Sequence, residues 1–295
     1  MAAELQERTR HRTLHWGGAE IHYWEYLPAA RTQGSRTIVA VHGFRGDHHG
    51  LLRVVEELPD QHIIMPDLPG FGVSGALAGI RHDVPGYASF LEAFLDALEL
   101  GPDTVLLGHS FGSIVASHFV ASRTGRVNPL ILVNPIASPA LEGPKGVLSK
   151  LALGYYVAAA RLPEPAGLAL LRSRLIVRLM SITMAKTRDK QLRRFIHAQH
   201  AAYFSAFANR DMLLESFRAS IGGTVREVAP RLALPVLLVA GAEDDIAPLP
   251  TQRQLLELLP DAELSVIGGV GHLIHYETPA EAARSITSFL ERHPA

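Results

Sequence analysis

The chain has no cysteine among its 295 residues. This absence excludes disulfide bonds, thiol catalysis and metal sites built on thiolates. The charges almost cancel, with 28 Lys and Arg against 29 Asp and Glu, so no overall charge favours nucleic acid as a partner. The chain also lacks a G-x-G-x-x-G loop and a G-x-x-x-x-G-K-[ST] loop, which leaves nucleotide binding without support. We therefore expect neither a cofactor nor a nucleic-acid partner.

Long apolar runs are missing as well. The uncharged stretch 151–160 is too short to cross a bilayer. Residues 1–12 are charged throughout and lack the apolar segment of a secretory signal. These features predict a soluble, cytoplasmic protein without a membrane span, which acts on a small molecule. The sequence leaves the oligomeric state open.

Short apolar segments alternate with amphipathic ones over most of the chain. Hydrophobic residues make up 47% of the sequence and charged residues 19%, which is enough apolar material for a large core. Runs such as IVAV, VLLG and LILV are continuously apolar, as is typical of parallel strands covered on both faces. Residues 21–27 alternate in polarity and predict an antiparallel edge strand. The pattern indicates an α/β fold with a mostly parallel sheet. Predicted strands span residues 21–27, 37–42, 62–66, 104–108, 129–134, 235–241 and 263–267.

One long segment, residues 136–225, interrupts this alternation. It shows no convincing strand, and helical patterns cover 147–160, 166–180 and 190–209. The segment holds 13 Lys and Arg against five Asp and Glu, a charge of +8, which leaves −9 for the rest of the chain. We expect a core formed by residues 1–135 and 226–295, with residues 136–225 as a helical cap.

The stretch Gly108-His109-Ser110-Phe111-Gly112 lies between a predicted strand and a predicted helix. It matches G-x-S-x-G, the sharp turn that exposes a nucleophilic serine above a sheet. Glycines on either side let neighbouring backbone approach closely. The turn also places Ser110 at a helix N-terminus, where free N–H groups favour developing negative charge.

A serine hydroxyl needs a base, and the base needs an orienting carboxylate. In this kind of fold the order along the chain is Ser, then Asp or Glu, then His. Downstream of Ser110, the acids of Glu243-Asp244-Asp245 follow one predicted strand, and His272 follows the next. Because all these positions lie after strands, we expect them to meet at the carboxyl end of the sheet.

Four further motifs accompany the serine turn, and together they resemble the α/β-hydrolase superfamily, in particular its cap-bearing, esterase- or lipase-like serine hydrolases. The resemblance covers nearly the whole chain outside the cap. The matching stretches are Val41-His42-Gly43-Phe44, Asp67-Leu68-Pro69-Gly70-Phe71-Gly72-Val73-Ser74, the acid loop Gly241–Pro248, and Gly271-His272.

The resemblance implies a role for each matching residue. Ser110 is expected to be the nucleophile and His272 the general base. The family's usual position, four residues before Pro248, selects Asp244 as the carboxylate that orients His272, with Asp245 as its main rival. The backbone N–H groups of Phe44 and Phe111 are expected to form the oxyanion hole, and His42 to brace the oxyanion loop at the edge of the substrate site.

The nucleophile narrows the reaction. Members of the superfamily that cleave haloalkanes or epoxides carry an aspartate at the position of Ser110, so serine favours hydrolysis of a carboxylic ester, a thioester or a lactone. Hydrolases that cleave carbon–carbon bonds of ring-cleavage products are an alternative. They usually have Asn before the serine, two glycines after it and Trp after the histidine, where this chain has His109, Gly112-Ser113 and Leu273. A small-molecule receptor of the same fold, with slow hydrolysis, is a further alternative.

Apolar and aromatic residues of the cap are candidates for substrate contacts, chiefly Tyr155, Met180, Tyr203 and Phe207. The alternative is that they pack the cap against itself and against the sheet. Cap arginines such as Arg193 and Arg194 could attract an anionic substrate or form a solvated face. The histidine pairs His197/His200 and His272/His275 lack the acidic partner of a metal motif, so we expect no metal.

Overall fold

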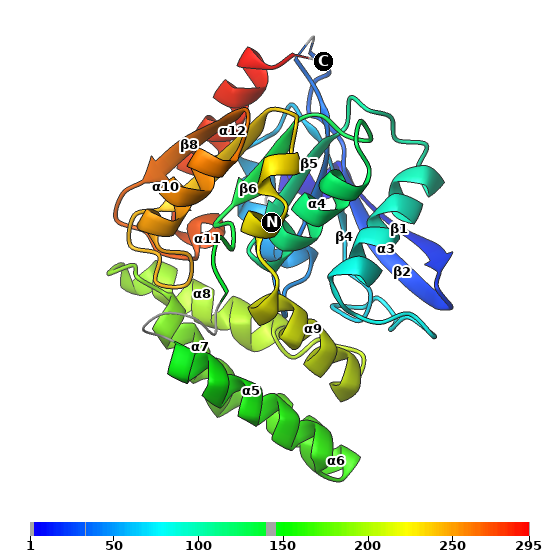
Figure 1. The fold of residues 1–295 in the computed structure, drawn as a ribbon, viewed down its shortest axis with the longest axis vertical. Helices are drawn as coiled ribbons and strands as arrows, with labels where there is room; N and C mark the ends of the chain where they lie inside the picture. The colour runs from blue at the N-terminus through cyan, green and yellow to red at the C-terminus, as the bar shows by residue number, and fades with distance from the viewer. Residues whose placement is uncertain (1–2, 33, 140–145, 295) are drawn as a thin grey trace.

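The computed structural model describes residues 3–32, 34–139 and 146–294. An eight-stranded sheet crosses the molecule in the order β1-β2-β4-β3-β5-β6-β7-β8 (Figure 1). The six strands from β4 to β8 in this order run parallel to one another. β2 pairs antiparallel with both β1 and β4. The predicted α/β fold with a mostly parallel sheet is confirmed. The strands are β1 (Thr9–Trp16), β2 (Ala19–Tyr26), β3 (Thr37–Val41), β4 (His62–Pro66), β5 (Val105–His109), β6 (Leu130–Val133), β7 (Val236–Gly241) and β8 (Ala262–Ile267).

The first strand corrects one prediction. Residues 21–27 were expected at the edge of the sheet, but β1 lies outside them and pairs with the whole of β2, from Thr9 opposite Tyr26 to Trp16 opposite Ala19. The side chains of β1 are mostly polar and exposed, and only Leu14 and Trp16 near its end pack partly buried against the core. Because these two apolar residues cover a short part of the strand, β1 shows too little apolar periodicity to indicate a strand.

Helices cover both faces of the sheet. Strand residues of odd and even position alternate between two buried clusters, as the two-residue period of a strand requires. One cluster contains α3 (Val84–Ala97), α4 (Phe111–Ser122) and α10 (Leu249–Leu258), and the other contains α1 (Ala3–Glu7), α2 (Leu52–Glu56), α11 (Ile274–Glu277) and α12 (Pro279–Arg292). This double cover explains why β3, β5, β6 and β7 read as continuously apolar runs.

The described residues between β6 and β7 form five α-helices. Figure 1 shows α5, α6 and α7 at the end of the molecule farthest from α12, with α8 and α9 between them and the sheet. We call this segment the helical insertion. Residues 166–180, predicted as one helix, are two helices that meet at Arg172 and Ser173. The helices are α5 (Gly146–Arg161), α6 (Glu164–Leu171), α7 (Arg174–Met184), α8 (Lys190–Tyr203) and α9 (Arg210–Gly222).

Short 3₁₀ turns complete the fold at η1 (His48–Leu51), η2 (Val225–Glu227) and η3 (Ala229–Arg231). Among the described residues, no helix has the length and apolarity needed to cross a membrane.

Candidate active site

Ser110 lies at the junction between β5 and α4. Its φ of 53° and ψ of −117° place it in a conformation that non-glycine residues rarely adopt. The Ser110 N–H donates to Val133 O of the neighbouring strand at 3.0 Å, and Ser113 N–H donates back to Ser110 O at 2.8 Å. These bonds hold the strained turn in place and leave the Ser110 side chain partly exposed.

The two glycines beside Ser110 are required by close backbone contacts. A Cβ on Gly108 would lie 2.4 Å from Gly112 O, and a Cβ on Gly112 would lie 2.3 Å from Val41 O. Any side chain at either position would therefore push β5, α4 and β3 apart. The G-x-S-x-G pattern is thus explained by packing around the turn.

His272 joins Ser110 to a buried carboxylate. Its Nε2 lies 2.8 Å from Ser110 Oγ, and its Nδ1 lies 2.8 Å from Asp244 Oδ2. An ionised carboxylate only accepts hydrogen bonds, so the Nδ1–H of His272 donates to Asp244. The lone pair of Nε2 then faces the hydroxyl of Ser110. Three residues far apart in the sequence are linked in one hydrogen-bonded chain.

Asp244 is almost completely buried and accepts four hydrogen bonds. Its Oδ1 accepts from the N–H groups of Ile246 and Ala247 at 2.8 and 2.9 Å, and its Oδ2 accepts from His272 and from Asn134 Nδ2 at 2.8 Å. Burial opposes ionisation of Asp244, but the charge of His272 and these hydrogen bonds outweigh burial and lower its pKa to about 2. The carboxylate is therefore ionised at neutral pH.

Asn134 is a part of this arrangement that the sequence patterns did not indicate. It directly follows β6 with a positive φ of 47°, and it also donates to Gly271 O at 3.2 Å. The rival carboxylate, Asp245, pairs instead with Lys186 of the helical insertion. Of these two acids, only Asp244 contacts His272.

The stretch after β3 lies against the serine turn. A Cβ on Gly43 would lie 3.2 Å from Ser110 Cβ, so the adjacent Phe44 backbone is close to the serine. His42 braces this stretch, since its Nδ1 donates to Gly43 O at 2.8 Å and its Nε2 accepts from Leu68 N–H at 2.9 Å. Among the described residues, the N–H groups of Phe44 and Phe111 have no acceptor.

A family model described as the alpha/beta hydrolase fold matches residues 36–279. The chain belongs to the α/β hydrolase fold family. Curated relatives include the pimeloyl-[acyl-carrier protein] methyl ester esterase of Chromobacterium violaceum, which is 29% identical over 86% of this chain and 94% of its own. The 2-hydroxy-6-oxo-2,4-heptadienoate hydrolase of Pseudomonas putida is 28% identical over 78% of each chain.

Solved structures of α/β hydrolases match over nearly the whole length. The esterase EaEST from Exiguobacterium antarcticum superposes with a TM-score of 0.74 at 17% identity, and the match covers 93% of this chain and 96% of that one. A thermophilic esterase from Thermogutta terrifontis gives the same TM-score at 21% identity over 96% and 98% of the two chains. At these identities the structural likeness shows the fold alone.

Two buried histidines lie behind the serine of this α/β hydrolase. The rings of His109 and His275 are 4.2 Å apart, and His109 also lies 5.6 Å from the ring of His272. Burial and the charge of His272 lower the pKa of His109 to about 3, and burial together with the charge of His109 lowers that of His275 well below 6.5. Both rings are therefore neutral at neutral pH.

The predicted substrate contacts of the helical insertion lie in different surroundings. Tyr155 is half-buried and donates to Leu170 O at 3.0 Å. Phe207 is buried, and Met180 is half-buried on α7. Tyr203 stacks on His49 with the ring centres 3.8 Å apart.

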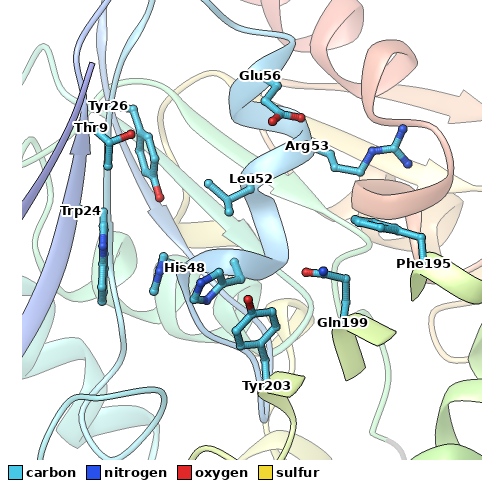
Figure 2. A pocket seen from close by; sticks show the side chains of 11 residues that line it. Thr9, Trp24, Tyr26, His48, Leu52, Arg53, Glu56, Phe195, Gln199 and Tyr203 are labelled. Atoms are coloured by element: carbon cyan, nitrogen blue, oxygen red, sulfur yellow. The ribbon is translucent and has the colours of Figure 1, made fainter. Parts of the chain in front are cut away.

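A cavity of about 460 Å³ lies between β1, β2, α2 and α8, and Tyr203 forms part of its wall (Figure 2). Its aromatic wall continues through His49 and His48 to Trp24, whose ring centre is 3.3 Å from that of His48. Neither Ser110 nor His272 lines this cavity, so it is separate from the site built on the serine turn. Its lining residues are Thr9, Trp24, Tyr26, His48, His49, Leu52, Arg53, Glu56, Phe195, Gln199 and Tyr203.

Asp47, His48 and His49 bring potential metal-ligating atoms within 4.8 Å of one another, and they are the one such group among the described residues. Each histidine is already held through Nδ1: His48 contacts Asp67 Oδ1 at 2.8 Å, and His49 contacts Asp47 Oδ1 at 3.2 Å. Through these contacts, the carboxylate oxygens of Asp67 and Asp47 orient the rings of His48 and His49.

Proposed function

We propose that this α/β hydrolase cleaves a carboxylic ester of a small, apolar substrate through an acyl-enzyme on Ser110. The main support is the hydrogen-bonded chain in which Asp244 holds His272 and His272 faces the hydroxyl of Ser110, with both distances at 2.8 Å. This arrangement of nucleophile, base and orienting group is the one that activates a serine for acyl transfer.

In the first half of the reaction, Ser110 Oγ attacks the carbonyl carbon while His272 Nε2 takes its proton. The carbonyl oxygen becomes an oxyanion, and we propose that the N–H groups of Phe44 and Phe111 bind it. His272 is now protonated on both nitrogens and carries one positive charge, which Asp244 beside Nδ1 stabilises. The Nε2 proton passes to the leaving alcohol as the ester bond breaks.

The second half repeats these steps with water. His272 takes a proton from the water, whose oxygen attacks the acyl carbon, and Ser110 receives the proton as it leaves. Asp244 acts as a carboxylate throughout, in keeping with its pKa of about 2. The proposal requires no metal and no cofactor for either half.

The helical insertion, residues 136–225, is proposed to act as a cap over this site. Its backbone pairs with the loop after β4: Gly72 N–H donates to Ala206 O at 3.0 Å, and Ala208 N–H donates to Gly70 O at 2.9 Å. In this proposal, Tyr155, Met180 and Phe207 contribute apolar surface towards the substrate, and His42 supports the oxyanion turn. Tyr203 lines a separate cavity and has the weakest support as a substrate contact.

The proposal is tested with p-nitrophenyl esters of short acids. We expect catalytic turnover by the wild-type protein and its loss in Ser110→Ala, with the circular dichroism spectrum unchanged. Hydrolysis by Ser110→Ala at the wild-type rate would contradict the role of Ser110. A single slow turnover per chain would favour the receptor alternative.

Carbon–carbon bond hydrolysis is the second candidate, because a relative 28% identical to this chain is a 2-hydroxy-6-oxo-2,4-heptadienoate hydrolase. Such a dienoate can be supplied to the protein in the same assay. If the kcat/KM for the dienoate is well above that for every ester tried, the proposed reaction becomes carbon–carbon bond hydrolysis. Ser110 should still be required for it.

A further inference from the structure

Arg45 directly follows Phe44 in the turn that begins at Gly43. Gly46 N–H donates to Gly43 O at 3.0 Å and closes this turn, and Arg45 has a φ of 59° at its third position. Glycine or asparagine is favoured at a turn position with positive φ, and a longer side chain is disfavoured there. The presence of arginine therefore calls for an explanation in its side chain.

The Arg45 side chain leaves the core and enters the helical insertion, where it is 1% exposed. Its Nε donates to Phe204 O at 2.8 Å, one Nη donates to Leu171 O at 2.8 Å, and the other Nη donates to Tyr156 Oη at 3.3 Å. The guanidinium also lies 5.5 Å from the ring centre of Phe207. One residue of the oxyanion turn thus binds three separate segments of the insertion.

Helix ends supply the negative charge that Arg45 needs. Within the described residues, no carboxylate lies within ion-pair distance of its guanidinium. Leu171 is the last residue of α6, and Phe204 is the residue that caps α8. Carbonyl groups at helix C-termini lack an intrahelical donor and carry the negative end of the helix dipole. The guanidinium therefore lies between the C-terminal ends of α6 and α8, and it donates to a carbonyl at each.

Phe44, the second residue of the turn, is half-buried and contacts the same part of the insertion. Its ring lies 5.8 Å from that of Tyr156 and 5.5 Å from that of Phe217, and these two rings stack on each other at 4.2 Å. Both side chains of the turn are therefore held by the insertion. A shift of α5 or of the end of α8 moves the backbone that carries the Phe44 N–H.

We propose that Arg45 is a positioning residue that ties the oxyanion turn to the helical insertion, so that the Phe44 N–H is aimed at the reacting carbonyl only while the insertion is in place. This role rests on the ester hydrolysis proposed above. It makes the insertion part of the catalytic geometry in addition to any part it has in choosing the substrate.

Arg45→Asn is the decisive variant, because asparagine accepts the positive φ but is too short to reach the insertion. We expect kcat, per site titrated with a fluorophosphonate, to fall about 10–100-fold. A misplaced oxyanion donor lowers the rate by at most as much as removing the donor does. KM should change less than about threefold, because the ground-state ester makes little use of the donor. The inhibition constant of a boronic acid, which forms a tetrahedral adduct, should rise by the same factor as kcat falls.

Arg172→Ala is the matched control. Arg172 lies 5.1 Å from the ring centre of Phe207 and donates to Phe207 O at 3.3 Å, so it contacts the same aromatic ring without touching the oxyanion turn. Its removal should leave kcat and the boronic acid constant at their wild-type values. An equal fall of kcat in this variant would overturn the proposal, since general loosening of the insertion would then explain both.

A wild-type kcat in folded Arg45→Asn, with only a lower melting temperature, would mean that Arg45 is merely structural. If Arg45→Asn does not fold, Tyr156→Phe is the test, because it removes one hydrogen-bond acceptor of Arg45 and keeps the ring against Phe44. The kcat of Tyr156→Phe should fall about two- to fivefold. An unchanged kcat would contradict the link between the oxyanion turn and the insertion. Wild-type protein that turns over no ester would refute the proposed function, and with it the role of Arg45. If the wild-type protein turns over an ester, and Arg45→Asn and Tyr156→Phe are both fully active, the role of Arg45 is refuted and the proposed function stands.

Discussion

The sheet core and the helical insertion differ in how their residues are held. Around Ser110 the supporting groups are buried and closely packed, from the carboxylate of Asp244, which accepts four hydrogen bonds, to the backbone contacts of Gly108 and Gly112. In the insertion, by contrast, large apolar side chains such as Leu175 and Leu179 are 79% and 62% exposed. In the proposed mechanism, the core supplies the reacting groups, and the insertion adjusts access and alignment.

The largest expected effect lies in the core. Asp244→Asn should lower kcat/KM by about 10³–10⁴, because the amide favours the wrong tautomer of His272 and cannot stabilise its charge. The matched control is Asp245→Asn, whose carboxylate pairs with Lys186 of the insertion and which should stay within about twofold of wild type. Steady-state kinetics on one ester measures both. Equal losses in the two variants would remove the distinction between core and insertion at this loop.

Buried histidines in both regions make the stability of the fold depend on pH. His109 and His275 in the core, and His200 in the insertion, have pKa values lowered by burial, to about 3 for His109 and His200. As the pH falls below about 6.5, the unfolded chain binds protons that the folded chain refuses, so stability should fall towards pH 3 by up to about 1.4 kcal/mol per pH unit for each histidine. Asp244, with its pKa lowered to about 2, adds a further loss only below about pH 4.

Urea unfolding at about pH 7.5 and about pH 5 measures this slope. His275→Gln should flatten this slope, because it removes one group that titrates in the unfolded chain but stays neutral in the folded chain. Equal free energies of unfolding of the wild-type chain at the two pH values would contradict the buried, neutral state of these rings.

The smallest expected effect is on substrate preference. Met180 is half-buried on α7 beside the exposed Leu179. If Met180 contacts the acyl chain, Met180→Ala should change the ratio of kcat/KM for butyrate and octanoate esters by about two- to tenfold, the range that one or two apolar contacts provide. Leu179→Ala should leave that ratio unchanged. An unchanged ratio in both variants would assign Met180 to packing alone.

Local patterns were sufficient for most of the core. β4 spans residues 62–66 as predicted, and the other predicted strands lie within two residues of their observed bounds, because most are apolar runs and residues 21–27 alternate in polarity. The order of Ser110, Asp244 and His272 was readable for a related reason, since each residue follows its own strand. β1 was missed because its side chains are mostly polar and exposed, with Leu14 and Trp16 as a short apolar pair at its end.

Residues that act through distant contacts could not be found in this way. Asn134 reaches Asp244, 110 positions later, and Arg45 reaches Leu171 and Phe204, 126 and 159 positions later. No spacing rule connects such pairs, because they depend on how separate elements pack. Asn134 and Arg45 share one feature, a positive φ, which only the structure reveals. Such a conformation is kept where the surroundings require it.

In the proposed mechanism, Ser110 is made nucleophilic by His272 and Asp244. Mass spectrometry of the intact protein and its peptides tests this role after reaction with a fluorophosphonate, which bonds to an activated serine oxygen as fluoride leaves. We expect one adduct per chain on the peptide that contains Ser110, none in Ser110→Ala, and labelling of His272→Ala slowed by about 10³-fold or more. Labelling of another residue, or equally fast labelling of His272→Ala, would contradict this account.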